Sequence, residues 1–286
     1  MHRDYSSISP SAKALLLTKS LTTIPFIADA ARLILGNDAV DQLATANHDE
    51  TFLKRLLHFE SRYLSLDSLL FASASLNVLE ISSGFSFRGL NMALNHPNVY
   101  YLDTDLEQII EIKNELTQQL IREEQLHLKG KLQTKILNAL DETAFTETVK
   151  QMPAGKLSII NEGLLMYLNP DEKTRLCQII HHILKQRGGY WITADIYIKK
   201  DLGQNDKPDA FNQFLNAHHV EDNKFDSFEQ AEAFFNAQGF KLITKATSVW
   251  HQLSSVKYVN AELMKRLIKQ AETIGKIRET WALKAI

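Results

Sequence analysis

The sequence contains little cysteine, glycine or proline, and each shortage excludes a class of protein. Among 286 residues there are 11 glycines, 6 prolines and one cysteine, Cys177. A single cysteine cannot form an internal disulfide or a cysteine zinc site, so we expect a reducing compartment, the cytoplasm. The low glycine and proline content excludes collagen-like and linker-rich chains. A globular protein is what remains.

Charge of one sign and long apolar runs are also missing. Lys and Arg total 32 and Asp and Glu total 34, which gives a formal net charge of -2. We therefore expect no nucleic-acid partner, because nucleic-acid-binding proteins present a basic surface. We also expect no signal peptide and no membrane partner, since Lys13 and Lys19 interrupt or bound the short N-terminal apolar stretch. No segment approaches the ~20 apolar residues that a membrane span needs. The oligomeric state stays open.

Strands and helices are predicted to alternate along most of the chain. Helical spacing covers 9–72, and further helices are predicted at 106–128, 170–187, 227–238 and 257–277. Short apolar runs predict strands at 76–81, 99–102, 131–137, 157–160, 190–194 and 240–249, with 281–283 as a closing edge strand. This alternation is typical of an α/β fold whose sheet is mostly parallel.

The predicted elements fit a single Rossmann-like domain over residues 1–286. Residues 1–72 would form a helical extension that caps the domain, and 73–198 with 227–286 would form the core. Residues 199–226 are polar and loop-like, so we interpret them as a late insertion that acts as a lid.

Acidic and polar residues follow the predicted strands. Ligands of open α/β sheets bind beyond the carboxyl ends of the strands, where the strand order reverses. The residues at these ends are Glu80, Asp103, Asp105, Asn138, Glu162 and Asp195. We therefore expect a ligand site along this edge of the sheet.

The loop after the first strand, SSGFSFRG at 82–89, lacks the full GxGxxG motif. Ser82 takes the place of the first glycine, and the bulky Phe85 and Phe87 follow Gly84. A pyrophosphate needs several glycines at a helix start. A nucleoside ligand without phosphates fits better, and S-adenosylmethionine (SAM) is our candidate, with Gly84 letting the backbone approach its amino-acid part.

Two acids lie where a ribose-binding carboxylate is expected. Asp103 and Asp105 stand about 20 residues beyond Gly84, the usual spacing for a carboxylate that accepts from the ribose hydroxyls. We expect one of the two to bind the ribose and the other to cap the helix that begins near Leu106. Glu162, between an apolar strand and GLLMYL, is expected to be buried and to need a partner, which the ammonium or sulfonium of SAM would provide.

Several segments together resemble the leucine carboxyl methyltransferase family. They are 9–34, 78–90, 100–113, 136–145, 159–168 and 188–197, and they cover nearly the whole chain in the family's order. The resemblance is to the bacterial branch that includes polyketide carboxyl O-methyltransferases. It implies a class I SAM-dependent methyltransferase fold, SAM as cofactor and a small-molecule acceptor that carries a carboxylate.

The resemblance also implies roles for individual residues. Gly84 would sit under the methionine part of SAM, Asp105 would hold the ribose, and Arg62 would lie over the cofactor carboxylate. The cofactor-binding set is Arg62, Glu80, Ser82, Gly84, Asp103, Asp105, Asn138, Ala139, Leu140 and Glu162, of which 138–140 would line the adenine. Ser82 departs from the small apolar residue or glycine common in the family, and Lys19 stands where many relatives carry arginine.

A carboxylate acceptor needs positioning rather than a general base. Its pKa of about 4 leaves it ionised at neutral pH, so we expect cations and hydroxyls around it: Lys19, Arg62, Arg88 and Tyr167. Solvated surface positions remain the alternative for Lys19 and Arg88, and simple packing for Tyr167. We expect no metal, because adjacent histidines on a helix point in different directions.

Two other functions remain open. The first is methylation of a hydroxyl or phenol, which would need a base such as His218 or His219. The second is a non-catalytic SAM-binding module.

Overall fold

Seven strands form one sheet whose order is β3-β2-β1-β4-β5-β7-β6 in a computed structural model that describes residues 9–199 and 210–286. The strands are β1 (Asn77–Glu80), β2 (Tyr100–Asp105), β3 (Lys131–Ile136), β4 (Leu157–Asn161), β5 (Gly189–Tyr197), β6 (Phe240–Lys245) and β7 (Arg278–Ala285). β1 to β5 pair in parallel, and β7 runs antiparallel to both of its neighbours. The predicted α/β fold with a mostly parallel sheet is confirmed.

The prediction for the last strand is wrong in position. We expected 281–283 to close the sheet as an edge, but β7 lies between β5 and β6. The physical reason is burial, because Trp281 and Leu283 are both 0% exposed and an edge strand would leave them in water. β6 takes the edge instead, and most of its side chains are at least partly exposed.

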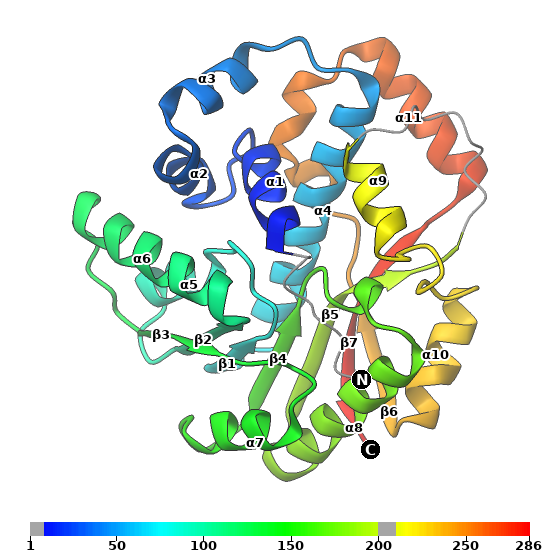
Figure 1. Ribbon diagram of the computed structural model, residues 1–286. Helices are drawn as coiled ribbons and strands as arrows, with labels where there is room; N and C mark the ends of the chain where they lie inside the picture. The colour runs from blue at the N-terminus through cyan, green and yellow to red at the C-terminus, as the bar shows by residue number, and fades with distance from the viewer. Residues whose placement is uncertain (1–8, 200–209) are drawn as a thin grey trace.

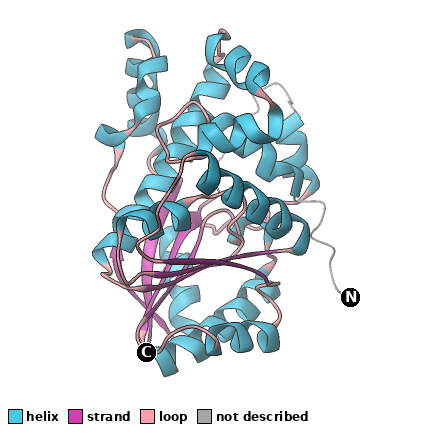
Figure 2. Cartoon of the chain, turned by 90° about the vertical axis from the view of Figure 1, so that its left-hand side faces the viewer, coloured by secondary structure: helices cyan, strands magenta, loops and turns pink. Residues whose placement is uncertain are grey.

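Helices cover both sides of the sheet (Figure 2). They are α1 (Ser9–Lys19), α2 (Ile27–Leu35), α3 (Asn37–Thr45), α4 (Glu50–Ala72), α5 (Arg88–Asn95), α6 (Glu107–Glu123), α7 (Glu142–Lys150), α8 (Pro170–Arg187), α9 (Ala210–Ala217), α10 (Phe228–Ala237) and α11 (Ala261–Ile274), with short 3-10 turns at Leu165–Tyr167, Trp250–Gln252 and Ser254–Tyr258. Side-chain caps explain several helix starts. Asp49 accepts from the N–H of Phe52, and Asn169 and Glu172 form a capping box on α8.

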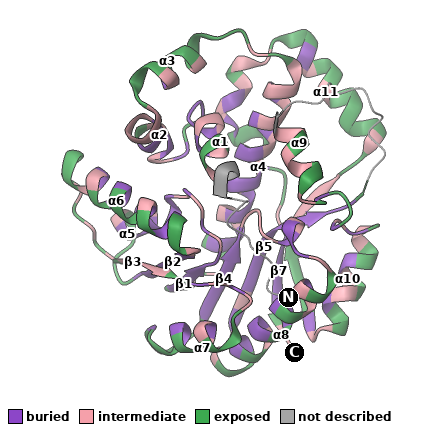
Figure 3. Cartoon of the chain, viewed as in Figure 1, coloured by how far each residue is buried: buried purple, intermediate pink, exposed green. Residues whose placement is uncertain are grey.

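The core follows the two faces of the sheet (Figure 3), and the central strands β1, β2, β4 and β5 are almost fully buried. One cluster joins the sheet to α8 and α10 and contains Trp191, Phe235 and Cys177. On the other side, the C-terminal half of α4 packs against the sheet through Leu66, Leu69 and Leu70. Within the described ranges, no helix is both long and apolar enough to cross a membrane.

Figure 1 shows α1, α2 and α3 together with α9 and α11 at the same end of the sheet. The helix α11, which belongs to the part of the chain that the sequence assigns to the core, therefore lies with the helical extension. Val249 and Leu253 pack against Leu57 of α4 and Leu267 of α11. Residues 200–209 of the predicted lid lie outside the described residues.

Candidate functional site

A cavity of ≈ 1830 Å³ opens at the carboxyl ends of the parallel strands. The strand order reverses there between β1 and β4, which is where such sheets bind ligands. Most of the predicted site residues line the cavity: Lys19, Arg62, Glu80, Ser82, Gly84, Asp105, Asn138, Ala139, Leu140, Glu162 and Tyr167. Arg88 and Asp103 are not among its lining residues, and both are corrected below.

Asp105 is held in place by the backbone at the end of β2. Its Oδ2 accepts from the N–H of Gly84 at 2.7 Å, and its Oδ1 accepts from the N–H of Leu106 at 2.7 Å. Burial raises the pKa of the Asp105 carboxyl, which these two backbone bonds lower in part. A carboxylate has about four acceptor positions, so two remain for hydroxyl donors from a ligand.

The loop after β1 has an unusual backbone that suits a ligand site. Ser82 has φ 51 and Gly84 has φ 50, both in the left-handed region. A side chain at position 84 would meet nothing within 4 Å, so the backbone borders open space there. The N–H of Gly84 donates to Asp105 and so is not directed at the cavity. Gly84 thus shapes the site by fixing Asp105.

The structure corrects the roles expected for Asp103. Its side chain is 1% exposed and its Oδ1 lies 3.0 Å from Nζ of Lys113, which is 0% exposed. Burial raises the pKa of Asp103 to about 7, against the opposing charge of Lys113. Asp103 is therefore an internal ion-pair partner that does not reach the cavity. Neither acid caps α6, because Leu106 is its N-cap residue and makes no side-chain cap bond.

Asn138, Ala139 and Leu140 form the cavity wall after β3. The N–H of Leu140 donates to Oδ1 of Asn138 at 3.0 Å, and Asp141 then caps α7 by accepting from the N–H of Ala144. The main chain of Leu137 also donates to the carbonyl of Asp105 at 2.8 Å. The loop predicted to line the adenine therefore adjoins the residue predicted to hold the ribose.

Glu162 already has three cationic partners within the protein. Nζ of Lys19 lies 2.7 Å and Nε of Arg62 3.1 Å from its Oε1, while Nη2 of Arg88 lies 3.0 Å from its Oε2. Burial alone would raise the pKa of Glu162, but the three cations outweigh burial and hold it below its usual range. The expectation that Glu162 needs the cofactor as its partner is wrong in this respect.

Arg88 is not a surface cation, and it does not line the cavity in which a methyl acceptor would bind. It is 1% exposed, and its guanidinium contacts Asp67 as well as Glu80 and Glu162. The guanidinium carbon also lies 4.1 Å from the ring centre of Tyr63. Arg88 therefore holds the cavity residues Glu80 and Glu162 in place without lining the cavity itself.

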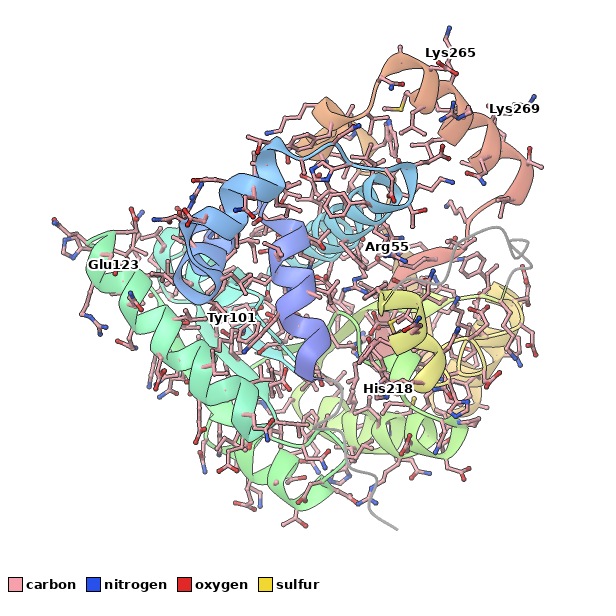
Figure 4. All side chains as sticks on the ribbon, turned by 45° about the horizontal axis from the view of Figure 1, so that its top comes forward. Arg55, Tyr101, Glu123, His218, Lys265 and Lys269 are labelled. Atoms are coloured by element: carbon pink, nitrogen blue, oxygen red, sulfur yellow. The ribbon has the colours of Figure 1, made fainter. Side chains whose placement is uncertain are left out.

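Glu80 completes this buried network. Its Oε1 lies 2.5 Å from Nη1 of Arg88, and its Oε2 accepts from Oη of Tyr101 at 2.5 Å. Tyr101 lies in the interior of the molecule, whereas Lys265 and Lys269 of α11 point outward (Figure 4). The acids Glu80, Asp67 and Glu162 balance the cations Lys19, Arg62 and Arg88 in charge.

Tyr167 lies on the cavity wall and also packs against aromatic rings. It lines the cavity, and its ring centre lies 6.3 Å from that of Phe214 and 6.1 Å from that of His218. His219 is exposed beside Asp222. Neither His218 nor His219 is among the cavity-lining residues, so the structure does not place either as a base for a hydroxyl acceptor.

Two cavity residues escaped the sequence analysis. Nε2 of His58 and Oη of Tyr197 are 2.8 Å apart, and Nη1 of Arg62 donates to the same Oη at 3.4 Å. The i, i+4 spacing of His58 and Arg62 was a usable signal, because it places both side chains on one helix face. Tyr197 gave no local signal beyond its place at the end of a strand.

Comparisons with known proteins give structural likeness only. No family model matches the chain, and no curated protein matches it in sequence. The magnesium protoporphyrin IX methyltransferase of Synechocystis PCC 6803, solved with bound SAH, shares 10% identity at a TM-score of 0.49, over 92% of this chain and 96% of its own.

Two further solved structures are similar over most of this chain. The mitomycin 7-O-methyltransferase shares 11% identity at a TM-score of 0.47, over 97% of this chain and 68% of its own. An O-methyltransferase from neocarzinostatin biosynthesis, in complex with S-adenosyl-L-homocysteine and 1,4-dihydroxy-2-naphthoic acid, shares 10% identity at a TM-score of 0.46, over 97% and 70%. At these values the likeness carries no argument about activity.

Proposed function

We propose that the chain is a SAM-dependent O-methyltransferase whose acceptor is the carboxylate of a small molecule. We further propose that it belongs with the leucine carboxyl methyltransferase family, in the bacterial branch with polyketide carboxyl O-methyltransferases. One observation carries the proposal. Asp105, fixed at the end of β2, shares a single cavity with the loops after β1, β3 and β4, at the point where the strand order reverses.

The residues present fit a nucleoside ligand. Asp105 keeps acceptor positions for two ribose hydroxyls, and Asn138 to Leu140 supply a wall for a base next to it. The loop after β1 brings the backbone close to open space at Gly84. It lacks the run of glycine N–H groups that a pyrophosphate needs, which supports a ligand without phosphates.

The cations of the cavity suit carboxylates. Lys19 and Arg62 both line it, and in the resemblance Arg62 lies over the carboxylate of the cofactor. Glu162 pairs with both cations, so their charge is partly neutralised before a carboxylate arrives. The same acid favours a positive sulfonium nearby. Buried pairs of this kind hold side chains in one geometry, and positioning is the main requirement of methyl transfer.

Bound SAM would supply an electrophilic methyl group, to which an acceptor oxygen bonds while the carbon–sulfur bond breaks and its electron pair stays on sulfur. A carboxylate is already ionised at neutral pH, so the protein has no proton to remove. We assign acceptor positioning to Lys19, Arg62 and Tyr167.

Methylation of a hydroxyl is the second candidate. A phenol titrates near ~10, so this reaction requires a base or a lowered acceptor pKa. Among the described histidines, His58 is the one that lines the cavity, where it contacts the Tyr197 hydroxyl. Its place on the cavity wall beside a hydroxyl is the observation that keeps this candidate. A non-catalytic SAM-binding module is the third.

One experiment separates the three. The protein is incubated with a metabolite extract and SAM labelled in the methyl group, and the products are treated with mild alkali. A carboxylate acceptor gives a methyl ester that alkali cleaves, with release of labelled methanol. Alkali-stable label indicates a hydroxyl acceptor. SAM binding without any transferred label indicates a binding module, and absence of SAM binding contradicts the whole proposal.

A further inference from the structure

The order of the strands lays out the cavity from one end to the other. Read from β3 through β2, β1 and β4 to β5, the strand ends present Asn138, Asp105, Gly84, Glu162 and Tyr197. In the proposed function the first three face the base, ribose and amino-acid parts of the cofactor, in that order, and Glu162 holds Lys19 and Arg62 beside them. Tyr197 is next along the same edge, so it stands beyond the part of the cavity that the proposed function gives to the cofactor.

Tyr197 also extends beyond its neighbouring strand. Asn161, the last residue of β4, is level with Thr193, and β5 continues for four more residues to Tyr197. At about 3.3 Å per residue this is at most roughly 13 Å past the end of β4, because β5 carries a register shift between Thr193 and Ile196. Tyr197 therefore reaches the cavity past Glu162, and its side chain lies between α4 and the strand ends.

Two neighbours of Tyr197 determine how its hydroxyl is used. Arg62 can only donate to Oη, so the hydroxyl hydrogen is directed at Nε2 of His58 or at a ligand. Burial, together with the charges of Arg278, Arg62 and Lys224, keeps the pKa of His58 well below its ordinary value, with Glu162 opposing. Burial also raises the pKa of Tyr197. At neutral pH the pair is therefore a neutral imidazole and a protonated phenol.

The wall around this end of the cavity combines apolar side chains with polar ones, among them Lys54, Asn212, Gln270 and Glu272. Side chains of α4, α9 and α11 contribute Leu57, Phe59, Phe211, Leu215, Leu267 and Ile274. Arg55 bridges α4 and α9 by donating to Asn212 at 3.0 Å, and Figure 4 shows it between these helices. A ligand here can place a polar group against Tyr197 and Arg62 and pack an apolar body against the apolar side chains of the three helices.

We infer that Tyr197 is a positioning residue for the acceptor. The Tyr197 hydroxyl and the Arg62 guanidinium hold the carboxylate of the acceptor, which is a monocarboxylic acid with an apolar body. The inference rests on the proposed function, because it takes the other end of the cavity as the cofactor site. His58 orients the hydroxyl and does not titrate during the reaction.

Laurate and 1-naphthoate serve as probes, titrated into the protein saturated with S-adenosylhomocysteine (SAH). Loss of a hydrogen bond to a charged group predicts that Tyr197→Phe weakens both probes about tenfold or more. The SAH affinity of the variant is expected to stay within about twofold of wild type, because Asp105, Gly84 and Asn138 make no contact with Tyr197 and Arg62 keeps its pair with Glu162. Tyr190→Phe, on the same strand but away from the cavity, is the matched control and leaves both affinities unchanged.

The outcomes are distinct. Failure of SAH to bind the wild-type protein refutes the proposed function. If SAH binds, the inference is overturned when neither probe binds at millimolar concentration, or when Tyr197→Phe weakens SAH as much as the probes. It is also overturned if dodecanol and 1-naphthol bind as tightly as the two acids. Probe affinity should be constant from pH 6 to 8, and a change across this range shows that His58 titrates.

Discussion

The two ends of the cavity are built in different ways. At the end formed by the strand loops, backbone groups hold the side chains, as the N–H groups of Gly84 and Leu106 hold Asp105. At the end formed with the helices, side chains hold one another over long sequence separations. Lys19 and Glu162, 143 residues apart, form one such pair. We therefore expect changes in the ion network around Glu162 to reduce stability, and changes at the strand loops to reduce ligand affinity.

The largest expected effect comes from the ion network. Glu162→Gln removes the anion shared by three buried cations, and breaking a buried pair in this way costs about 3–5 kcal/mol. Urea denaturation measures the loss. Glu147→Gln is the matched control, because its pair with Lys150 is exposed and is expected to change stability by less than about 0.5 kcal/mol. Equal losses in the two variants would contradict the account.

The same variant predicts how stability depends on pH. The pKa of Glu162 is depressed in the folded protein, so its stabilisation is complete above the unfolded pKa of about 4.3 and is lost as the pH falls through lower values. Glu162→Gln lacks this group. The stability difference between wild type and variant should therefore shrink by about 1.4 kcal/mol per pH unit below about pH 4. A difference that grows on acidification would reverse the assigned sign.

The strand-loop end is also the part that could be predicted from the sequence. Short apolar runs followed by Gly84, Asp105 and Asn138 are local patterns, and the sheet places them together because parallel strands end at one edge. The helix-lined end depends on contacts between distant segments. The partners of Glu162, the burial of Arg88 and the pairing of Asp103 with Lys113 needed the folded structure.

Sequence reasoning failed for similar reasons elsewhere. The position of β7 inside the sheet depends on which strand buries Trp281 and Leu283, and no local pattern specifies that. His58 and Tyr197 come from different elements, and their contact exists only in the folded protein. Apolar spacing predicts which segments form strands and helices, but it does not predict which strands lie next to one another in the sheet.

A smaller effect is expected at the strand loops. Gly84→Ala places a β-carbon on a left-handed residue, which costs roughly 1–2 kcal/mol of stability. Because Gly84 fixes Asp105, the variant should also bind SAH several-fold more weakly. Gly36→Ala is the matched control, since Gly36 also has a positive φ and open surroundings but does not line the cavity. It should lose stability and keep its SAH affinity.

The central claim is that Asp105 holds a nucleoside cofactor, and calorimetric titration of SAH tests it most directly. Asp105→Asn keeps the shape of the side chain but removes its charge, and it should weaken SAH binding by about tenfold or more. Asp171→Asn, an exposed acid at the start of α8, should bind as wild type does. Unchanged affinity in Asp105→Asn, or no binding of SAH to the wild-type protein at millimolar concentration, would contradict the account.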